Sequence, residues 1–199
     1  MTPAIQAIRA QMAESIAVKQ ALLEDAQLLA QIEALAGQCL AALKAGGKII
    51  FAGNGGSFAD AQHLSAELIS RFRFDRAPLA SVALGTNNSA ISAISNDYGY
   101  AQVFSRELEA VAKPEDVFIA LSTSGNSPNI LAAIEKAERL GIATACLTGR
   151  TGGKLAAIYN CLRIPSDEVA RVQECHITIG HIICGLVEHM YFAEGENRP

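Results

Sequence analysis

Short apolar runs that alternate with helical patterns constrain the fold of this chain more than any other feature of its sequence. The runs are nearly continuous in apolar residues and are bounded by Gly, Asn, Ser or Pro, which is typical of parallel strands buried on both faces. They are KIIFAG (48–53), ASVALG (80–85), DVFIALS (116–122), IATACLT (142–148) and YNCLRIP (159–165). Helices are expected between them, at 57–71, 88–95, 101–112, 128–140 and 153–158. This alternation predicts right-handed crossovers and a doubly wound α/β sheet.

Helical patterns also precede and follow these runs. Residues 5–46 are rich in Ala, Leu, Gln and Glu, with apolar residues at spacings of three and four. They predict two helices, broken near Asp25, the second of which ends at Gly46. A long helix is expected over residues 167–192.

The sequence predicts a single domain over residues 1–199, because the chain contains no low-complexity linker and no second composition. Within it, residues 1–46 form the N-terminal helices, 47–166 the α/β core and 167–192 the C-terminal helix. Apolar residues on the flanking helices suggest a homo-oligomer.

Composition disfavours several classes of protein. Half of the residues are hydrophobic and 18% are charged, which is typical of a well-buried globular chain. A net charge of −4 without a basic stripe argues against nucleic acid as a partner. Five cysteines without a C-x-x-C pair indicate reduced thiols in the cytoplasm. Neither the N-terminus nor the apolar run ITIGHIICGLV fits a signal peptide or a membrane span, so no membrane partner is expected.

Two similar loops each follow an expected strand and precede an expected helix: GNGGS (53–57) and STSGNS (122–127). Open α/β sheets bind ligands at these carboxyl ends of their strands. In the second loop Ser127 and Pro128 form the start of a helix, whose free N–H groups and positive dipole end would point at the loop. Four hydroxyl side chains there suit phosphate oxygens, although Gly, Asn and Ser are also ordinary turn residues.

Two common nucleotide motifs do not fit. A dinucleotide fingerprint starting at Gly53 would require glycine in place of Phe58. The stretch TGRTGGK (148–154) lacks P-loop spacing, and Leu155 stands where Ser or Thr is needed. The expected ligand is therefore a small phosphorylated metabolite.

A histidine and a glutamate follow the first loop on one helical face, His63 and Glu67. Such a pair serves proton transfer or metal binding, and it is equally common as a surface ion pair. The last helix carries Gln173 and the three other histidines, which in an apolar helix are more often core or interface residues. Relative to Gln173, His176 is rotated by about 60° one way and His181 by about 80° the other, about 12 Å along the axis. Spacing alone therefore does not favour His181.

Five stretches together resemble one known family. They are AGNGGSFADAQHLSAELISRF, SNDYG, STSGNSPNI, LTGRTGGK and RVQECHITIGHIICGLVE, and the resemblance covers nearly all of the chain. In this combination the chain resembles the sugar isomerase (SIS) domain and, within it, the sedoheptulose-7-phosphate isomerases, also called phosphoheptose isomerases. The resemblance implies an α/β fold in which a five-stranded parallel sheet is flanked by helices in a flavodoxin-like, three-layer arrangement. It also implies a homotetramer with active sites at subunit boundaries and a bound zinc ion (Zn2+) in each subunit.

The resemblance assigns roles to individual residues. The zinc ligands would be His63, Glu67, Gln173 and His181, which selects His181 where geometry did not. Glu67 would be the catalytic base and His181 the acid. Ala170 stands where one family pattern has aspartate, so it receives no role. Substrate contacts would come from Asn54, Gly55, Gly56, Ser57, Glu67, Arg71, Asn96, Asp97, Ser122, Thr123, Ser124, Ser127 and Gln173.

The implied function is an aldose–ketose isomerase that converts sedoheptulose 7-phosphate to D-glycero-D-manno-heptose 7-phosphate through an enediol(ate), for lipopolysaccharide or capsule synthesis. A carboxylate bound to zinc is a weaker base, so Glu67 would either leave the metal during turnover or bind it in an inhibited or structural state. Alternatives are a non-enzymatic SIS adaptor that binds the replication initiator, a sugar-phosphate-sensing regulatory domain, and an isomerase of another phosphosugar. Glu67 favours the enzyme, because the adaptor pattern lacks glutamate at that position.

Overall fold

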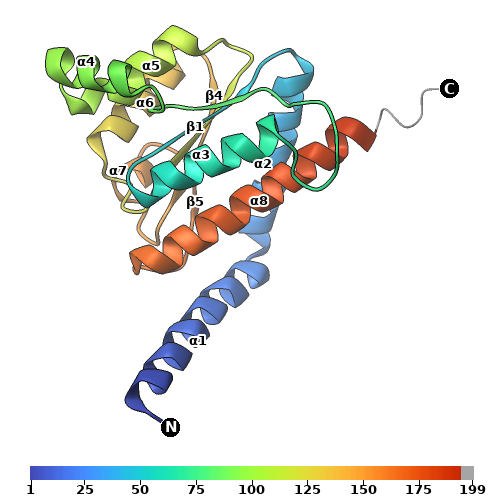
Figure 1. The fold of residues 1–199 in the computed structure, drawn as a ribbon, viewed down its shortest axis with the longest axis vertical. Coiled ribbons are helices and arrows are strands. Elements are labelled where there is room, and N and C mark those ends of the chain that lie inside the picture. Colours follow the sequence, from blue (N-terminus) through green and yellow to red (C-terminus); the bar gives the residue numbers. More distant parts are fainter. Residues whose placement is uncertain (194–199) are drawn as a thin grey trace.

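The computed structural model describes residues 1–193 (Figure 1). A single sheet of five parallel strands lies at its centre, in the order β2-β1-β3-β4-β5. This confirms the predicted parallel sheet and its five strands. The strands are β1 (Ile49–Gly53), β2 (Ser81–Ala83), β3 (Val117–Ser122), β4 (Ala143–Thr148) and β5 (Cys161–Arg163).

Helices connect and flank the strands. They are α1 (Pro3–Glu24), α2 (Ala26–Lys44), α3 (Gly56–Ile69), α4 (Asn88–Tyr98), the 3-10 helix η1 (Tyr100–Gln102), α5 (Val103–Val111), α6 (Pro128–Arg139), α7 (Gly153–Ala156) and α8 (Val169–Ala193).

The sheet separates two apolar cores, which gives the three layers that the resemblance implies. In β1, Ile49 and Phe51 pack in the core that includes residues of α2, α3 and α8. The alternate residues of the same strand, Ile50 and Ala52, pack in the core that includes residues of α5, α6 and α7. Successive side chains of a strand point to opposite faces, so a strand covered on both sides must be apolar throughout.

The predicted break between the two N-terminal helices lies at Asp25. This residue ends α1 and caps α2, because its carboxylate accepts a hydrogen bond from the Leu28 N–H (2.9 Å). Helix α1 then extends away from the sheet (Figure 1). It is attached to the start of α8 by hydrogen bonds from Ser15 Oγ to Glu174 Oε2 (2.6 Å) and from Arg171 Nη1 to the Gln11 carbonyl (2.7 Å).

Among the described residues one helix, α2, is long and apolar enough to cross a membrane by length and composition. Leu28, Ile32, Leu35 and Cys39 on this helix are buried in the core shared with the sheet and α8. Packing in that core accounts for its apolar character.

Several predicted boundaries were wrong by a few residues. Helix α3 ends at Ile69 because Ser70, with a ψ of −104°, turns the chain away, so Arg71 lies in the following loop. Helix α4 continues past residue 95 as far as Gly99, whose φ is +84°. The helix expected at 101–112 is a 3-10 turn followed by α5, and the last helix begins at Val169.

Candidate active site

The order of the strands creates a switch point between two loops. β1 leads to its neighbour β2 on one side, whereas β3 leads to β4 on the other, so the chain leaves the carboxyl ends of β1 and β3 in opposite directions. Ligands of open α/β sheets bind at such a switch point. Gly53 lies opposite Leu121 in the sheet, which brings together loops 53–57 and 122–127. These are the two loops that the sequence indicated.

Glycines allow the first loop to turn tightly. Gly55 caps α3 with a φ of +56°, a conformation that glycine adopts without strain. A β-carbon on Gly53 would collide with the backbone of Ser57, and one on Gly56 would collide with the side-chain amide of Gln173. The first N–H groups of α3 have no partner within the helix. The loop therefore offers backbone donors to a small anion, with Gln173 directly over it.

A reciprocal amide pair joins the two loops. Asn54 Nδ2 donates to Asn129 Oδ1 (2.9 Å), and Asn129 Nδ2 donates to Asn54 Oδ1 (2.8 Å). Asn129 is 3% exposed and lies in the first turn of α6. The Tyr100 hydroxyl donates to the same oxygen of Asn54 (3.3 Å). Because the Asn54 amide carries two N–H groups, one of them is left for the predicted substrate contact.

Hydroxyl groups lie at both ends of the second loop. Ser122 Oγ and Ser127 Oγ are 3.3 Å apart. Ser127 precedes α6 and Pro128 is in its first turn, as predicted, but the Ser127 side chain makes no capping hydrogen bond. Pro128 has no N–H, and the Ile130 N–H donates to Asn129 Oδ1 (3.0 Å). The Ser127 hydroxyl and the Asn129 N–H are therefore the groups at the start of α6 that could bind an anionic ligand.

The remaining predicted substrate residues lie in three places. Thr123 and Ser124 line a surface hollow beside the second loop. Arg71 is exposed in the loop after α3. Asn96 and Asp97 line a separate exposed hollow on α4, where Asn96 Nδ2 donates to Asp97 Oδ1 (2.8 Å). Within this one chain, the structure does not place Asn96 and Asp97 at the switch point between the two loops.

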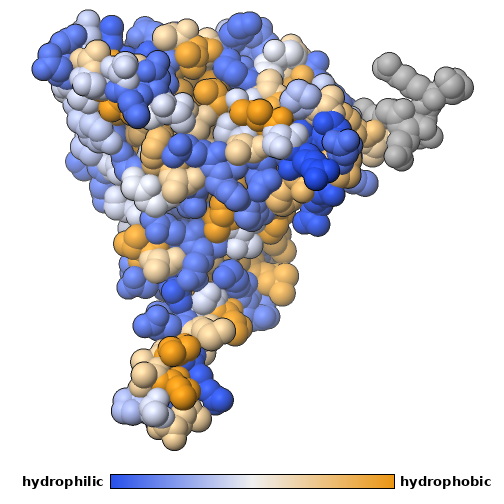
Figure 2. Space-filling view, in the orientation of Figure 1, coloured by the Kyte–Doolittle hydropathy of each residue, from blue (hydrophilic) through white to orange (hydrophobic). Residues whose placement is uncertain are grey.

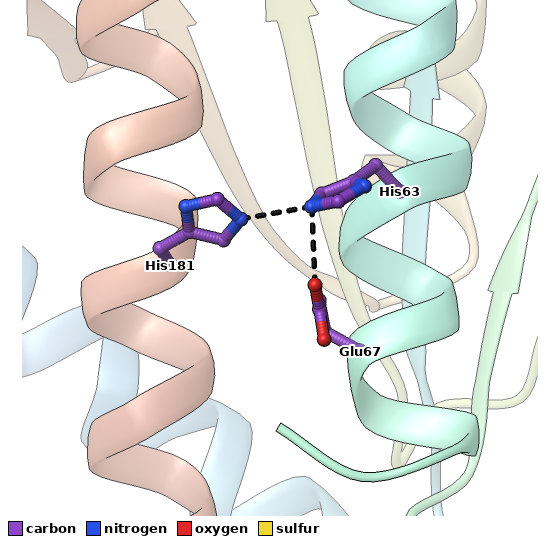
Figure 3. Close-up of side chains that lie close together, drawn as sticks. All are labelled: His63, Glu67 and His181. Carbon is purple, nitrogen blue, oxygen red and sulfur yellow. Dashed lines mark hydrogen bonds and ion pairs between the residues drawn. The ribbon is translucent and has the colours of Figure 1, made fainter. Parts of the chain in front are cut away.

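Three side chains from two helices meet at one point (Figure 3). His63 and Glu67 lie one turn apart on α3, and His181 points toward them from α8. His63 Nε2 is 3.1 Å from Glu67 Oε1 and 2.9 Å from His181 Nε2. The His63 side chain is 52% exposed, so the cluster is accessible to a ligand.

The hydrogen bonds at this cluster are restricted because both short contacts of His63 are made by its Nε2 atom. Nε2 of a neutral imidazole carries either a proton or a lone pair. His63 Nε2 therefore cannot donate to Glu67 and, in the same state, accept a hydrogen bond from His181. One ligand atom from each of the three residues lies within 4.8 Å of the others. Two imidazoles and a carboxylate are ligands that zinc takes in proteins, so these residues fit the expected metal.

Two titratable groups near the cluster have shifted pKa values. Burial lowers the pKa of His181, the neighbouring His63 lowers it further, and the Glu67 carboxylate raises it. Burial raises the pKa of Asp60, one turn before His63, while the histidine lowers it. A lowered pKa favours the neutral form of the His181 imidazole, which can bind a metal or accept a proton.

The packing of α8 beside α3 explains how His181 reaches the cluster (Figure 1). Gln173 faces Gly56 at the start of α3, and His181 faces His63 further along the same helix. The two α8 residues therefore meet two different points of α3, which spacing along α8 alone could not show. The role of Gln173 as a metal ligand stays a prediction.

Close packing between α3 and α8 requires a small residue. A β-carbon on Gly180 would collide with the side chain of Leu64. His176, on the buried side of α8, has no exposed surface and takes no part in the cluster.

Sequence reasoning missed three residues that support the site. Phe72 stacks on the His181 ring, with centroids 5.5 Å apart. Asn129 and Tyr100 hold the first loop. They lie in a loop or at helix ends, where no periodic pattern indicates a contact with a distant residue. The one sequence signal among them is that Asn129 closely follows the second loop.

Comparisons with known proteins identify the family of this fold. A family model described as the SIS domain matches residues 12–149. The phosphoheptose isomerase of Aneurinibacillus thermoaerophilus is 50% identical over 186 residues, which cover 93% of this chain and 94% of the relative.

Two solved structures are similar to the whole chain. The phosphoheptose isomerase GmhA of Neisseria gonorrhoeae is 40% identical with a TM-score of 0.86, covering 92% of this chain and 97% of the relative. A phosphoheptose isomerase of Francisella tularensis is 34% identical with a TM-score of 0.88, covering 95% of this chain and all of the other. The chain therefore belongs to the SIS-domain family and, within it, to the phosphoheptose isomerases.

Proposed function

We propose that the protein is an aldose–ketose isomerase that converts sedoheptulose 7-phosphate into D-glycero-D-manno-heptose 7-phosphate. One observation carries the proposal: helix α3 begins in an anion-binding type of loop and carries His63 and Glu67 further along, where His181 of α8 joins them. The family of the chain supports the same reaction, since its relatives are named phosphoheptose isomerases.

The reaction moves one proton between adjacent carbons. Glu67 removes a proton from C1 of the ketose and returns it to C2, while a proton passes from O1 to O2, so that atoms balance and the intermediate is an enediol(ate). His181, which points into the same cluster, exchanges the oxygen protons. Its lowered pKa favours a neutral ring at pH 7, which can accept the O1 proton and then donate to O2.

The phosphate end of the substrate would bind at the switch point. Backbone N–H groups at Gly55, Gly56 and Ser57 and the hydroxyls of Ser122 and Ser127 surround that position. The remaining predicted contacts, from Asn54, Arg71, Asn96, Asp97, Thr123, Ser124 and Gln173, would hold the hydroxyl groups of the sugar.

We propose that His63, Glu67 and His181 hold a zinc ion, with Gln173 as the fourth ligand. A zinc ion at this position would polarise the substrate carbonyl. Because a metal-bound carboxylate or imidazole is a weaker base, Glu67 and His181 would transfer protons only when released from the metal. Metal analysis of protein purified without added metal should find zinc in the wild type and much less in His63→Ala. Equal metal contents in the two proteins would contradict this ligand set.

A homotetramer with sites at subunit boundaries is also proposed. An apolar stripe on α1 supports an oligomer: Ile5, Ile8, Met12 and Ile16 are 44% to 66% exposed, and Figure 2 shows apolar surface on this projecting helix. The exposed Asn96 and Asp97 of α4 could then face the site of a neighbouring subunit.

Substitution of this stripe tests the oligomer. Met12→Lys should give a smaller assembly in light scattering, whereas Gln6→Lys on the same helix should not. A Met12→Lys protein of unchanged mass would argue against α1 as part of the interface.

We propose a cytoplasmic location and a place in heptose synthesis for lipopolysaccharide or capsule. The five cysteines are all free, which suits a reducing compartment. Nucleic acid is not an expected partner, since the net charge is −4.

Proton NMR in deuterated water tests the activity. With sedoheptulose 7-phosphate the protein should produce aldose anomeric signals, and Glu67→Gln should not. If the protein neither converts the substrate nor incorporates deuterium, with or without zinc, the result would support a non-enzymatic SIS adaptor or an isomerase of another phosphosugar. Full activity of Glu67→Gln would contradict the assignment of the base.

A further inference from the structure

A buried ion pair lies directly behind the cluster, between the loop after α3 and helix α8. Arg76 Nε donates to Glu188 Oε1 (2.9 Å). The Arg76 side chain is 2% exposed and that of Glu188 is not exposed at all. A buried pair of charges stabilises little by itself, because removing both ions from water offsets most of their attraction. The role of this ion pair is therefore indicated by the groups that it contacts rather than by its contribution to the free energy of unfolding.

Arg76 is bound to the end of the helix that carries Glu67. Its Nη2 donates to the Glu67 carbonyl (2.9 Å), and its Nη1 donates to the carbonyls of Leu68 (2.7 Å) and Ser70 (3.0 Å). The last carbonyls of a helix have no partner within the helix. A planar guanidinium can satisfy several of them at once, which an ammonium group cannot do with the same geometry. Arg76 therefore fixes the turn of α3 on which Glu67 lies.

Glu188 fixes the loop on the other side of the cluster. Its two carboxylate oxygens accept hydrogen bonds from the N–H groups of Phe72 (2.9 Å) and Arg73 (2.8 Å). The Phe72 ring held in this way stacks on His181 at 5.5 Å with an interplanar angle of 22°. Gly185 leaves the space for this loop, because a β-carbon there would crowd Phe72 and Arg73.

We infer that Arg76 and Glu188 are positioning residues for the isomerase reaction: the ion pair sets the separation and orientation of Glu67 and His181. The inference rests on the proposed roles of those two residues. One partner reaches Glu67 through its carbonyl, and the other reaches His181 through Phe72. Among the described residues, the hydrogen bonds of Arg76 and Glu188 do not reach the loops at the switch point, so we expect phosphate binding to be retained without the pair.

The chain contains a matched control at the other end of the sheet. Asp116 immediately precedes β3, at the amino end of the sheet, and its side chain is not exposed. Like Glu188, it accepts hydrogen bonds from two backbone N–H groups, those of Lys48 and Lys113 (both 2.8 Å), and from one cation, Lys48 Nζ (2.7 Å). Asp116→Asn thus makes the same kind of change to a buried carboxylate, far from the site.

The test compares kcat and KM for Glu188→Gln, Arg76→Lys and Asp116→Asn, each assayed well below its own melting temperature. Glu188→Gln and Arg76→Lys should lower kcat by about tenfold or more, because small displacements of catalytic groups reduce rates steeply. Their KM should change by less than about threefold, since the interactions lost act on the reacting groups rather than on binding. Asp116→Asn should lose a similar amount of thermal stability and keep its kcat. In wild type the His181 ring protons should also show an upfield NMR shift from Phe72, which Glu188→Gln should lose.

Equal kcat values in Glu188→Gln and Asp116→Asn at matched stability, or an effect on KM alone, would overturn the inference. An inactive Glu67→Gln alongside a fully active Glu188→Gln would overturn only the positioning role. Full activity in Glu67→Gln would overturn the proposed base and the positioning role together.

Discussion

His176 should make the folded state sensitive to mild acid. The side chain has no exposed surface, and neither ring nitrogen has a hydrogen-bond partner among the described residues. Burial lowers the pKa of His176 from 6.5 to about 4, although the Thr148 backbone raises it slightly. The unfolded chain therefore takes up a proton as the pH falls through 6.5, whereas the folded protein resists it until about pH 4.

The sign and size of the effect follow from this difference. Stability is fully present above the unfolded pKa of 6.5 and is lost as the pH falls toward 4, because the unfolded state binds more protons. At 1.36 kcal/mol for each pKa unit, the loss reaches about 3 kcal/mol by pH 4, and about half of it has occurred by pH 5.5. This is a substantial part of the free energy of unfolding of an ordinary domain.

Urea unfolding of wild type and His176→Leu between about pH 8 and pH 4, at one protein concentration, measures the effect. Leucine is apolar and cannot titrate, so the variant should match or exceed wild-type stability near pH 8 and gain relative to it as the pH falls. Contributions from other groups, such as Glu107 with its raised pKa, cancel in the difference. Parallel curves for His176→Leu and wild type would refute the reasoning.

Three further predictions concern the site. Gly180→Ala should destabilise the protein by about 1–3 kcal/mol by overpacking against Leu64. Zinc titrations followed by thermal melting should show weaker metal binding in this variant; unchanged metal affinity would mean that α8 adapts without moving His181. Asn129→Leu should raise the KM for the phosphosugar more than it lowers kcat, because Asn54 loses its reciprocal amide partner; an unchanged KM would show that the loop holds its shape without the pair. Added zinc should raise the melting temperature of chelator-treated protein more at about pH 8 than at about pH 5.5, since the ligands must lose protons to bind; equal shifts at both pH values would argue against histidine ligands.

Local patterns were sufficient to predict the sheet and the neighbouring positions of the two loops. Each strand is apolar along its whole length because helices cover both faces, so KIIFAG and DVFIALS are recognisable without any partner. Parallel strands end at one edge of the sheet, so two loops of similar composition after two strands had to lie at the same edge. The break predicted near Asp25 is also found there.

Features that depend on contacts between distant segments could not be predicted in the same way. His181 joins His63 because Gly180 lets α8 approach Leu64, and no spacing within one helix contains that information. Glu188 is an ordinary acidic residue in the sequence, yet its partner Arg76 lies 112 positions away and both are buried. The exposed ends of α3 and α4 were also misplaced, since the residues that end a helix there depend on the loop that follows.

Helix α3 links the two halves of the proposed site. Its first turn, at Gly56, belongs to the loop that would hold the phosphate, and Glu67 lies near its other end. Side chains of a helix lean toward its N-terminus, so the Glu67 carboxylate reaches back toward the loop. His63 follows Ser57 by six positions, which is about 9 Å along the axis. Because a helix is far stiffer than a loop, α3 fixes the distance between the phosphate and the reacting carbons. Its start is held by the switch-point loops and its end by Arg76, so in the proposed site we expect the backbone of α3 to set the length of sugar that fits.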